Sequence, residues 1–514
     1  MGGKYLIGLF LMLLGCFGGT VLTCLWKRSR DFFFFLMIIL MPMTERFDIN
    51  FISRDFYRGT TRGFEFSLVD ILSISLLASA VLIPRKGWSR GFWPASFGFL
   101  LLFFFYACFN VGMSDPKLFG LFELSKMIRG LIIFLAAAFY VREEREMGIF
   151  ILAMGLIVSY EGALALQQRY FGRINRVPGT LDDSNSLSVF LCTTAPIFAA
   201  AINSRIPKLL KGLSAIAIAL ACVGVVLTIS RMGVVIVALV LMGATFATIS
   251  YQVTARKMVI GLVVLLGATG IVAKSWKTLE SRFKSSTITE EYGSNKNLGR
   301  GYYIRVARAI VDDRVLGVGL NNWSYWVSQK YGPRLGYHFV HYSGTDRDPV
   351  RIIPPGSNVD DAQAAPAHSL GALTAGELGL PGLILFAFLW MRWFQIGASF
   401  FWKRTMDPMH RMGVGIFFAL LGIFLSSLTE WVFRHSPIYY TIHVLLGVLA
   451  SLYFIKKKAK REAAGEALND EQFPEETSDQ NESNQPFPEP QPIYSAQGSA
   501  LDGGFFPSPK GNPA

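Results

Sequence analysis

Two arginines that stand apart from other charges are the first candidates for chemistry in this chain. Arg231 separates two apolar segments, and Arg300, flanked by glycines, opens a run that continues to Arg305 and Arg308. A planar guanidinium binds phosphate oxygens through two parallel hydrogen bonds. We therefore predict an anion-binding site for phosphate. The alternatives are a guanidinium that reaches the membrane surface from an apolar hairpin, and an exposed basic helix face.

His368 is the candidate for proton transfer, because imidazole gains and loses a proton near neutral pH. A lone histidine is more often structural, so this residue type alone does not decide its role. Glu377 follows nine residues later, a spacing that puts it on the opposite face of a continuous helix. The two side chains are therefore not expected to pair. A carboxylate at membrane depth needs a partner, for which an arginine is suitable.

Other polar residues give weaker signals. Lys126, Arg129 and Glu161 lie in or near apolar segments, where they either line the same cavity or form ion pairs. His338 and His341 with nearby aspartates have spacing too loose for a metal site. The cysteines all lie in apolar stretches and are expected to pack as small hydrophobic residues. We predict no metal and no cofactor.

The elements that must position these residues are membrane-spanning helices. The chain has 514 residues, of which 52% are hydrophobic and only 17% charged, with a mean hydropathy of +0.39. Apolar runs long enough to cross a bilayer recur along its length. We expect an all-α integral membrane protein with about 12–13 spans. The candidates are 5–25, 32–44 (short), 66–84, 93–113, 119–141, 147–166, 187–203, 211–229, 232–250, 257–274, 370–393, 412–429 and 437–455.

The net charge of +13 is explained by the positive-inside rule rather than by nucleic-acid binding. Short loops rich in Lys and Arg fall on one side if the spans alternate, and that side is predicted to be cytoplasmic. The segments 45–65, 167–186, 275–369 and 430–436 then face outward. Attraction of an anionic substrate is a second reason for positive charge on the outer side.

Four regions follow from this pattern: N-terminal spans (1–274), a large external loop (275–369), C-terminal spans (370–455) and a polar tail (456–514). Long loops on rigid scaffolds often carry function. The tail is rich in Pro, Glu, Gln, Asn and Ser and is predicted to be disordered. It is either a solvated tail or a docking arm for another envelope protein.

Four motifs, in this order, resemble the O-antigen ligase and polymerase superfamily of bacterial membrane glycosyltransferases. They are Arg176-Val-Pro-Gly-Thr-Leu-Asp-Asp-Ser-Asn, Ser230-Arg-Met-Gly, the helix from Arg300 to Gly-Val-Gly319, and His368 to Glu377-Leu-Gly-Leu-Pro-Gly. The resemblance covers roughly 1–455. Two departures are Ser369, where the family usually has Asn, and Ile304, where an aromatic residue is common.

The resemblance implies a fold similar to GT-C membrane glycosyltransferases and metal-independent transfer of a glycan from undecaprenyl diphosphate to an acceptor sugar hydroxyl. The acceptor would be a glycan or glycolipid, and the reaction would occur on the periplasmic face of the bacterial inner membrane. In this reading His368 activates the acceptor hydroxyl, while Arg231 and Arg300 stabilise the diphosphate. The predicted substrate-binding residues are Arg305, Arg176, Asn185 and Glu377.

Three other readings stay open. A polymerase of the same family would use the same site with a different acceptor. A lipid-linked glycan flippase or transporter would be expected to show inverted repeats and charges at the midplane, and neither is evident. A non-catalytic scaffold would act through the tail.

Overall fold

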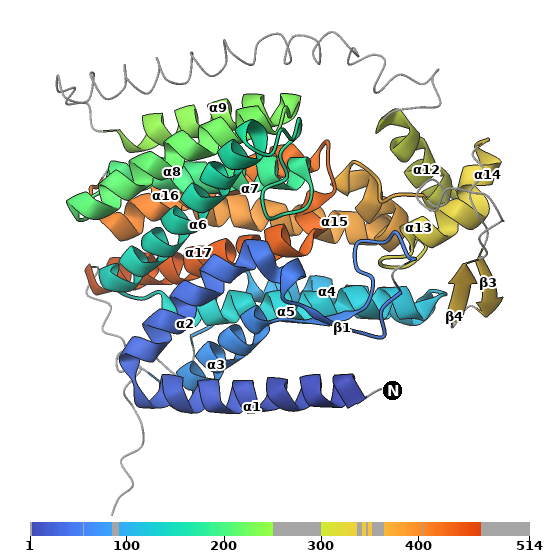
Figure 1. Ribbon diagram of the computed structural model, residues 1–514, viewed down its shortest axis with the longest axis horizontal. Helices are drawn as coiled ribbons and strands as arrows, with labels where there is room; N and C mark the ends of the chain where they lie inside the picture. Colours follow the sequence, from blue (N-terminus) through green and yellow to red (C-terminus); the bar gives the residue numbers. More distant parts are fainter. Residues whose placement is uncertain are drawn as a thin grey trace, which may run out of the picture. The chain divides into compact units, whose positions relative to one another are not determined.

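The computed structural model describes residues 3–54, 56–84, 92–249, 300–336, 342–345, 348–351, 364–402 and 405–463. These residues form an all-α, multi-pass membrane protein (Figure 1). Within the described ranges, eight helices are long and apolar enough to cross a membrane, and two shorter apolar helices accompany them. The predicted span at 257–274 and the tail beyond residue 463 lie outside the described residues.

The helices before the external loop are α1 (Gly3–Leu25), α2 (Lys27–Leu40), α3 (Leu68–Leu82), α4 (Phe97–Met113), α5 (Lys117–Tyr140), α6 (Glu144–Tyr170), α7 (Ser184–Ile202), α8 (Lys208–Leu227) and α9 (Arg231–Thr248). The segment between α9 and α15 contributes α12 (Arg300–Asp313), α13 (Trp323–Trp326) and α14 (Gly332–Arg334). The last helices are α15 (Leu370–Ala398), α16 (Pro408–Ser427) and α17 (Ser436–Ala463).

The short second span predicted at 32–44 is completed by a different kind of helix. α2 has 14 residues, or about 21 Å of helix, which is less than a bilayer core of roughly 30 Å. The 3-10 helix η1 (Met41–Arg46) follows directly and adds about 12 Å. Together the two helices are long enough to cross.

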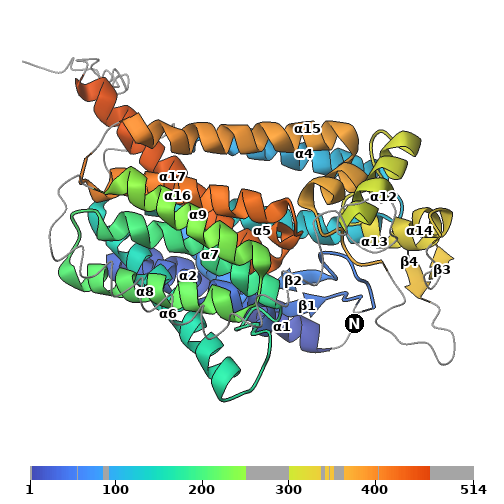
Figure 2. The same cartoon turned by 90° about the horizontal axis from the view of Figure 1, so that it is seen from above.

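The bundle is built around α7, which packs against α8, α9 and α16 and is the most thoroughly buried of the apolar helices. Small residues allow close approach: a Cβ on Gly415 of α16 would lie 2.9 Å from Ala200 of α7. Around this centre, α5 packs against α3 and α17, and α6 packs against α2 and α8. Figure 2 shows α4 beside α15, in agreement with their contacts.

Two antiparallel hairpins accompany the helices. β1 (Ile49–Phe51) pairs with β2 (Phe64–Phe66), so that Asn50 lies opposite Glu65. β3 (Tyr342–Thr345) pairs with β4 (Asp348–Arg351) in the segment between α14 and α15. Figure 1 shows α12, α13 and α14 gathered near the beginning of α15, at one end of the bundle. The described parts of the segments predicted to face outward meet at this end.

α17 continues to Ala463, past the boundary at residue 456 predicted for the disordered tail. Its last turns carry Lys460 and Arg461, cations that interact favourably with the C-terminal end of a helix dipole. The amphipathic end of this helix extends beyond the apolar segment, and a hydropathy pattern alone does not reveal such an extension.

Candidate active site

Three of the residues predicted for the site contact one carboxylate, that of Glu430, and a fourth reaches it through Asn185. His368 Nδ1 lies 2.7 Å from Glu430 Oε2, and Arg300 Nη2 lies 3.1 Å from Oε1. Asn185 donates to the same Oε1 at 3.3 Å, and Arg176 donates to Asn185 Oδ1 at 2.9 Å. We refer to these five residues as the Glu430 cluster. It joins α7, α12, the start of α15 and the loop between α16 and α17.

The contact with Glu430 determines which nitrogen of His368 can act as a base. A carboxylate only accepts hydrogen bonds, so Nδ1 is the donor and the lone pair of the neutral ring is on Nε2. The His368 side chain is 37% exposed, whereas that of Glu430 is 12% exposed. The histidine is therefore held from its protected side and remains accessible to a substrate hydroxyl.

Tyr303 of α12 covers the other side of the histidine, with ring centroids 5.6 Å apart. Burial raises the pKa of Tyr303, and the nearby Glu430 raises it further, against the opposing charges of Arg300 and Arg58. The phenol therefore stays protonated at neutral pH and keeps a hydrogen-bond donor beside the cluster. Arg58, between β1 and β2, also contributes to the positive field at Tyr303.

Backbone hydrogen bonds between the segment that follows α12 and the first turns of α15 fix the position of Arg300 relative to His368. Val318 N donates to Gly376 O and Gly319 N donates to Glu377 O, both at 2.9 Å. Gly317 has φ +77°, and a Cβ there would lie 2.3 Å from Glu377 O. The Gly-Val-Gly motif is thus explained by close backbone packing.

On the α15 side of this backbone packing, Gly379 has φ +69° and interrupts the helical geometry. Ser369, which replaces the family's usual Asn, is the N-cap of α15, and its side chain accepts from Ala372 N. Its hydroxyl fixes the start of the helix directly after His368.

Arg176 and Asn185 are placed by a loop that is fastened to α6. The backbone of Gly179 exchanges two hydrogen bonds of 2.9 Å with the Gln168 side chain, and Thr180 N donates to Glu161 at 3.0 Å. Glu161 is therefore a structural anchor of this loop.

Arg231 is the first residue of α9, where Ser230 caps the helix by accepting from Gly233 N. Gly233 packs against Ser188, which lies one turn after Asn185 in α7. Arg231 therefore lies at the same end of the bundle as the Glu430 cluster. Arg305 is on the same helix as Arg300 and is partly buried.

Glu377 does not belong to the Glu430 cluster, and its predicted role in substrate binding does not fit its position. It is 1% exposed and forms an ion pair with Arg434, which also contacts Glu123 at 3.1 Å. Glu123 in turn pairs with Lys126 at 2.9 Å. We call these four residues the buried ion cluster. Burial lowers the pKa of Arg434, but its two carboxylate partners outweigh this and raise it.

The expectation that Glu377 lies away from His368 and pairs with an arginine is thus confirmed by the contact with Arg434. Lys126 belongs to the same cluster and is fully buried, so it does not line the Glu430 cluster. Arg129 forms a separate group of ion pairs with Asp48, Glu65 and Asp70.

Sequence reasoning missed Glu430. The available signal was an isolated acidic residue at the beginning of the short outward segment 430–436, directly after a span. A carboxylate in such a place needs a partner. Its partners lie 62, 130 and 245 residues away, and no sequence spacing relates them.

Within the described ranges, no group of three His, Cys, Asp or Glu residues is arranged to hold a metal ion. His338 and His341 lie outside the described residues.

The comparison with protein families gives a match at residues 216–387, about a third of the chain, to the O-antigen ligase family. This match supports the resemblance of the chain to the O-antigen ligase and polymerase superfamily. The matched range includes Arg231, Arg300 and His368. Asn185 and Glu430, on which the cluster also depends, lie outside it. No curated protein matches the chain.

Proposed function

We propose that this protein transfers a glycan from an undecaprenyl diphosphate carrier to an acceptor sugar hydroxyl, as an O-antigen ligase. The observation that carries the proposal is the Glu430 carboxylate shared by His368 and Arg300. It brings a base with a defined tautomer together with a fixed cation. A reaction that deprotonates a hydroxyl while releasing a phosphate needs both of these groups.

In the proposed reaction the acceptor oxygen attacks the anomeric carbon, and its proton passes to Nε2 of His368. The bond between that carbon and the diphosphate oxygen breaks, and the electron pair stays with the leaving diphosphate. Arg300 and Arg231 stabilise the charge on the phosphate oxygens. A single displacement of this kind inverts the anomeric configuration. Glu430 holds the histidine and stabilises its protonated form.

Arg176 and Asn185 are proposed to bind the donor or acceptor at the margin of the cluster. Arg176 donates to Asn185, which donates to Glu430. A substrate that binds Arg176 or Asn185 therefore contacts a residue that is hydrogen-bonded to the partner of His368, directly or through one side chain. Arg305, on the same helix as Arg300, is a weaker candidate for the diphosphate.

The proposal is tested by replacing Arg231, Arg300 and His368 singly with Ala, and by profiling lipid-linked and mature surface glycans. The matched control is Arg308→Ala, an exposed arginine of α12 that pairs only loosely with Asp312 at 3.9 Å. We expect the three site variants, at normal membrane levels, to accumulate carrier-linked glycan, and the control to behave as wild type. Unchanged glycan processing in all three would refute the assignment.

The same experiment separates a ligase from a repeat-unit polymerase, which differs in its acceptor. Long carrier-linked chains indicate a missing ligase, and single carrier-linked repeats indicate a missing polymerase. If the protein were a flippase, its inactive variants would instead leave the lipid-linked glycan in the cytoplasmic leaflet.

We further propose that the Glu430 cluster faces the periplasm in the inner membrane. The support is that basic loops flank the opposite end of the bundle. An Arg308→Cys variant should react with a membrane-impermeant maleimide added to intact spheroplasts. Labelling only after membrane disruption would place the cluster on the cytoplasmic side.

A further inference from the structure

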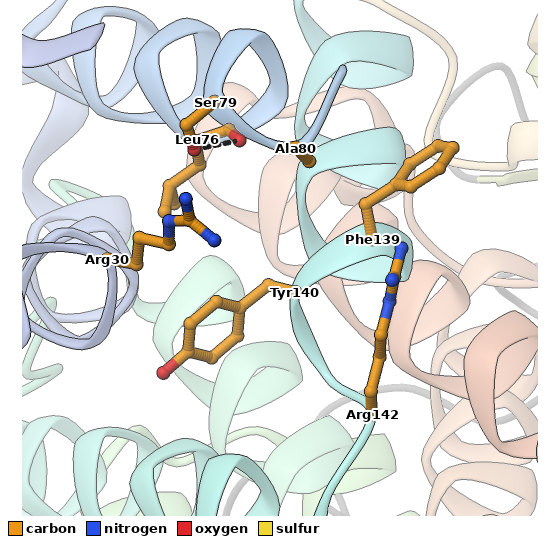
Figure 3. Close-up of a pocket in the computed structure, with 7 residues that line it drawn as sticks. All are labelled: Arg30, Leu76, Ser79, Ala80, Phe139, Tyr140 and Arg142. Carbon is orange, nitrogen blue, oxygen red and sulfur yellow. Dashed lines mark hydrogen bonds between the residues drawn. The ribbon is translucent and has the colours of Figure 1, made fainter. Parts of the chain in front are cut away.

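A small cleft lies between α2, α3 and α5 at the end of the bundle away from the Glu430 cluster (Figure 3). Along α5, Tyr140 in the cleft is about 25 Å from Glu123 of the buried ion cluster. The walls are apolar where Leu76, Ala80 and Phe139 line them, and two guanidinium groups, from Arg30 and Arg142, enter the cleft.

The Arg30 guanidinium is fixed in this cleft. Its Nε donates to the carbonyl of Thr23 at 2.6 Å. Within the described part of the chain, this is the one hydrogen bond the Arg30 side chain makes. Figure 3 shows the guanidinium directed between α3 and the ring of Tyr140. Across the cleft, Arg142 lies over the ring of Phe139, 5.6 Å from its centroid.

The acidic side chain nearest in sequence to Arg30 is already engaged. Asp31 forms an ion pair with Arg145 and accepts a hydrogen bond of 2.7 Å from Tyr140. A partly buried guanidinium at the membrane boundary is costly without an anionic partner. An anion from outside the protein would supply that partner, and phosphate matches the guanidinium geometry.

The surroundings of the cleft indicate which phosphate it takes. The residues beside it in the sequence are exposed and strongly apolar: Leu25 and Trp26 on one side, Val81 and Leu82 on the other. Tryptophan is typical of the depth at which lipid headgroups lie. A ligand in this cleft would have its anionic group against arginine and its apolar part beside lipid-facing side chains.

We propose that this cleft binds the phosphate of an anionic phospholipid. The headgroup phosphate lies between Arg30 and Arg142, and the acyl chains follow the exposed apolar surfaces of α1 and α3. The site is separate from glycan transfer, because it rests on residues at the opposite end of the bundle.

The test uses the purified full-length chain in detergent and native mass spectrometry with dioleoyl phosphatidylglycerol or dioleoyl phosphatidylcholine. The wild type should retain the anionic lipid preferentially. Arg30→Gln should weaken that binding about tenfold or more, as expected for loss of a charge-assisted hydrogen bond. Arg28→Gln removes the same charge from an exposed position of α2 and should keep the preference.

Arg142→Gln is the second variant, because Arg30→Gln also loses the contact with Thr23. It should lose the preference while its melting temperature without lipid stays near that of the wild type. Full retention by both variants would overturn the proposal, as would equal loss in Arg28→Gln. Millimolar inorganic phosphate should not displace the lipid. If it does, the cleft is a site for free phosphate and the lipid assignment is wrong.

Discussion

Replacing Glu430 with Gln should disable the candidate base while preserving the shape of the site. The carboxylate accepts a hydrogen bond from His368 at Oε2 and from Arg300 at Oε1. An amide has one accepting oxygen and one donating nitrogen. If its oxygen faces His368, its NH2 group opposes Arg300. If its oxygen faces Arg300, the NH2 group donates to Nδ1 and forces the proton onto Nε2, so the base is lost.

The magnitude follows from the role of the histidine. General base catalysis contributes about 10²–10⁴-fold, or about 3–5 kcal/mol of transition-state stabilisation. His368 is 37% exposed, so water can restore part of its orientation. We therefore expect Glu430→Gln to lower the transfer rate by about a hundredfold. The effect on folding should be near 1 kcal/mol, because Arg300 at 23% exposure is partly solvated.

The assay measures transfer from a lipid-linked glycan to its acceptor by the purified protein in detergent. Asp313→Asn is a matched carboxylate control, since Asp313 pairs with Lys330 and Arg334 in the same external loop. A double variant, Glu430→Gln with His368→Ala, should lose less activity than the sum of the two single losses, and what it loses beyond His368→Ala reports the contact with Arg300. Additive losses, or wild-type activity in Glu430→Gln, would show that Glu430 does not act through the histidine.

Three further predictions concern stability. Glu377→Gln removes one of the two carboxylates that neutralise the buried Arg434, so it should destabilise the protein by about 3–5 kcal/mol. A second change, Arg434→Gln, should restore part of this stability. Thermal melting measures both effects. Gly317→Ala should lower the melting temperature more than Gly336→Ala, because both have positive φ but only Gly317 meets backbone atoms. Hydrogen bonds from two cationic neighbours lower the pKa of Asp313. Its contribution to local stability is therefore present above the ordinary aspartate pKa of 3.8 and is lost as the pH falls through the lower pKa of the folded state. Hydrogen exchange of α14, measured against pH, should show this loss.

Clear results would contradict each of these. A double variant less stable than Glu377→Gln would show that the two residues do not compensate each other. Equal melting temperatures for the two glycine variants would remove the steric argument at Gly317. Acid-sensitive exchange that persists in Asp313→Asn would assign that sensitivity to another group.

The sequence predicted the membrane-spanning elements well because hydropathy is a local property that each helix carries by itself. It also selected Arg176, Asn185, Arg300 and His368, which the fold brings together. Those residues stand near loop boundaries, where a charged or polar side chain contrasts with apolar surroundings.

The sequence did not reveal Glu430, nor which arginine pairs with Glu377, because both depend on tertiary pairing. Glu377 differs from Glu430 in burial and partner, yet each is simply a glutamate near the end of an apolar segment. Similarly, the sequence shows the Gly-Val-Gly motif at the end of the segment from Arg300, but it does not show that the glycines pack against α15. The two glutamates are distinguished only by the tertiary structure, which places Arg434 beside Glu377.

The buried ion cluster also constrains how the chain is assembled during synthesis. Glu123 and Lys126 lie on one helix and can neutralise each other when α5 enters the membrane. Glu377 enters with α15 and meets Arg434 only after α16 has been made. Until then its charge has no partner, so a ribosome-bound chain that ends before residue 434 should remain engaged with the insertion machinery. Release into the bilayer would follow completion of the α16–α17 loop.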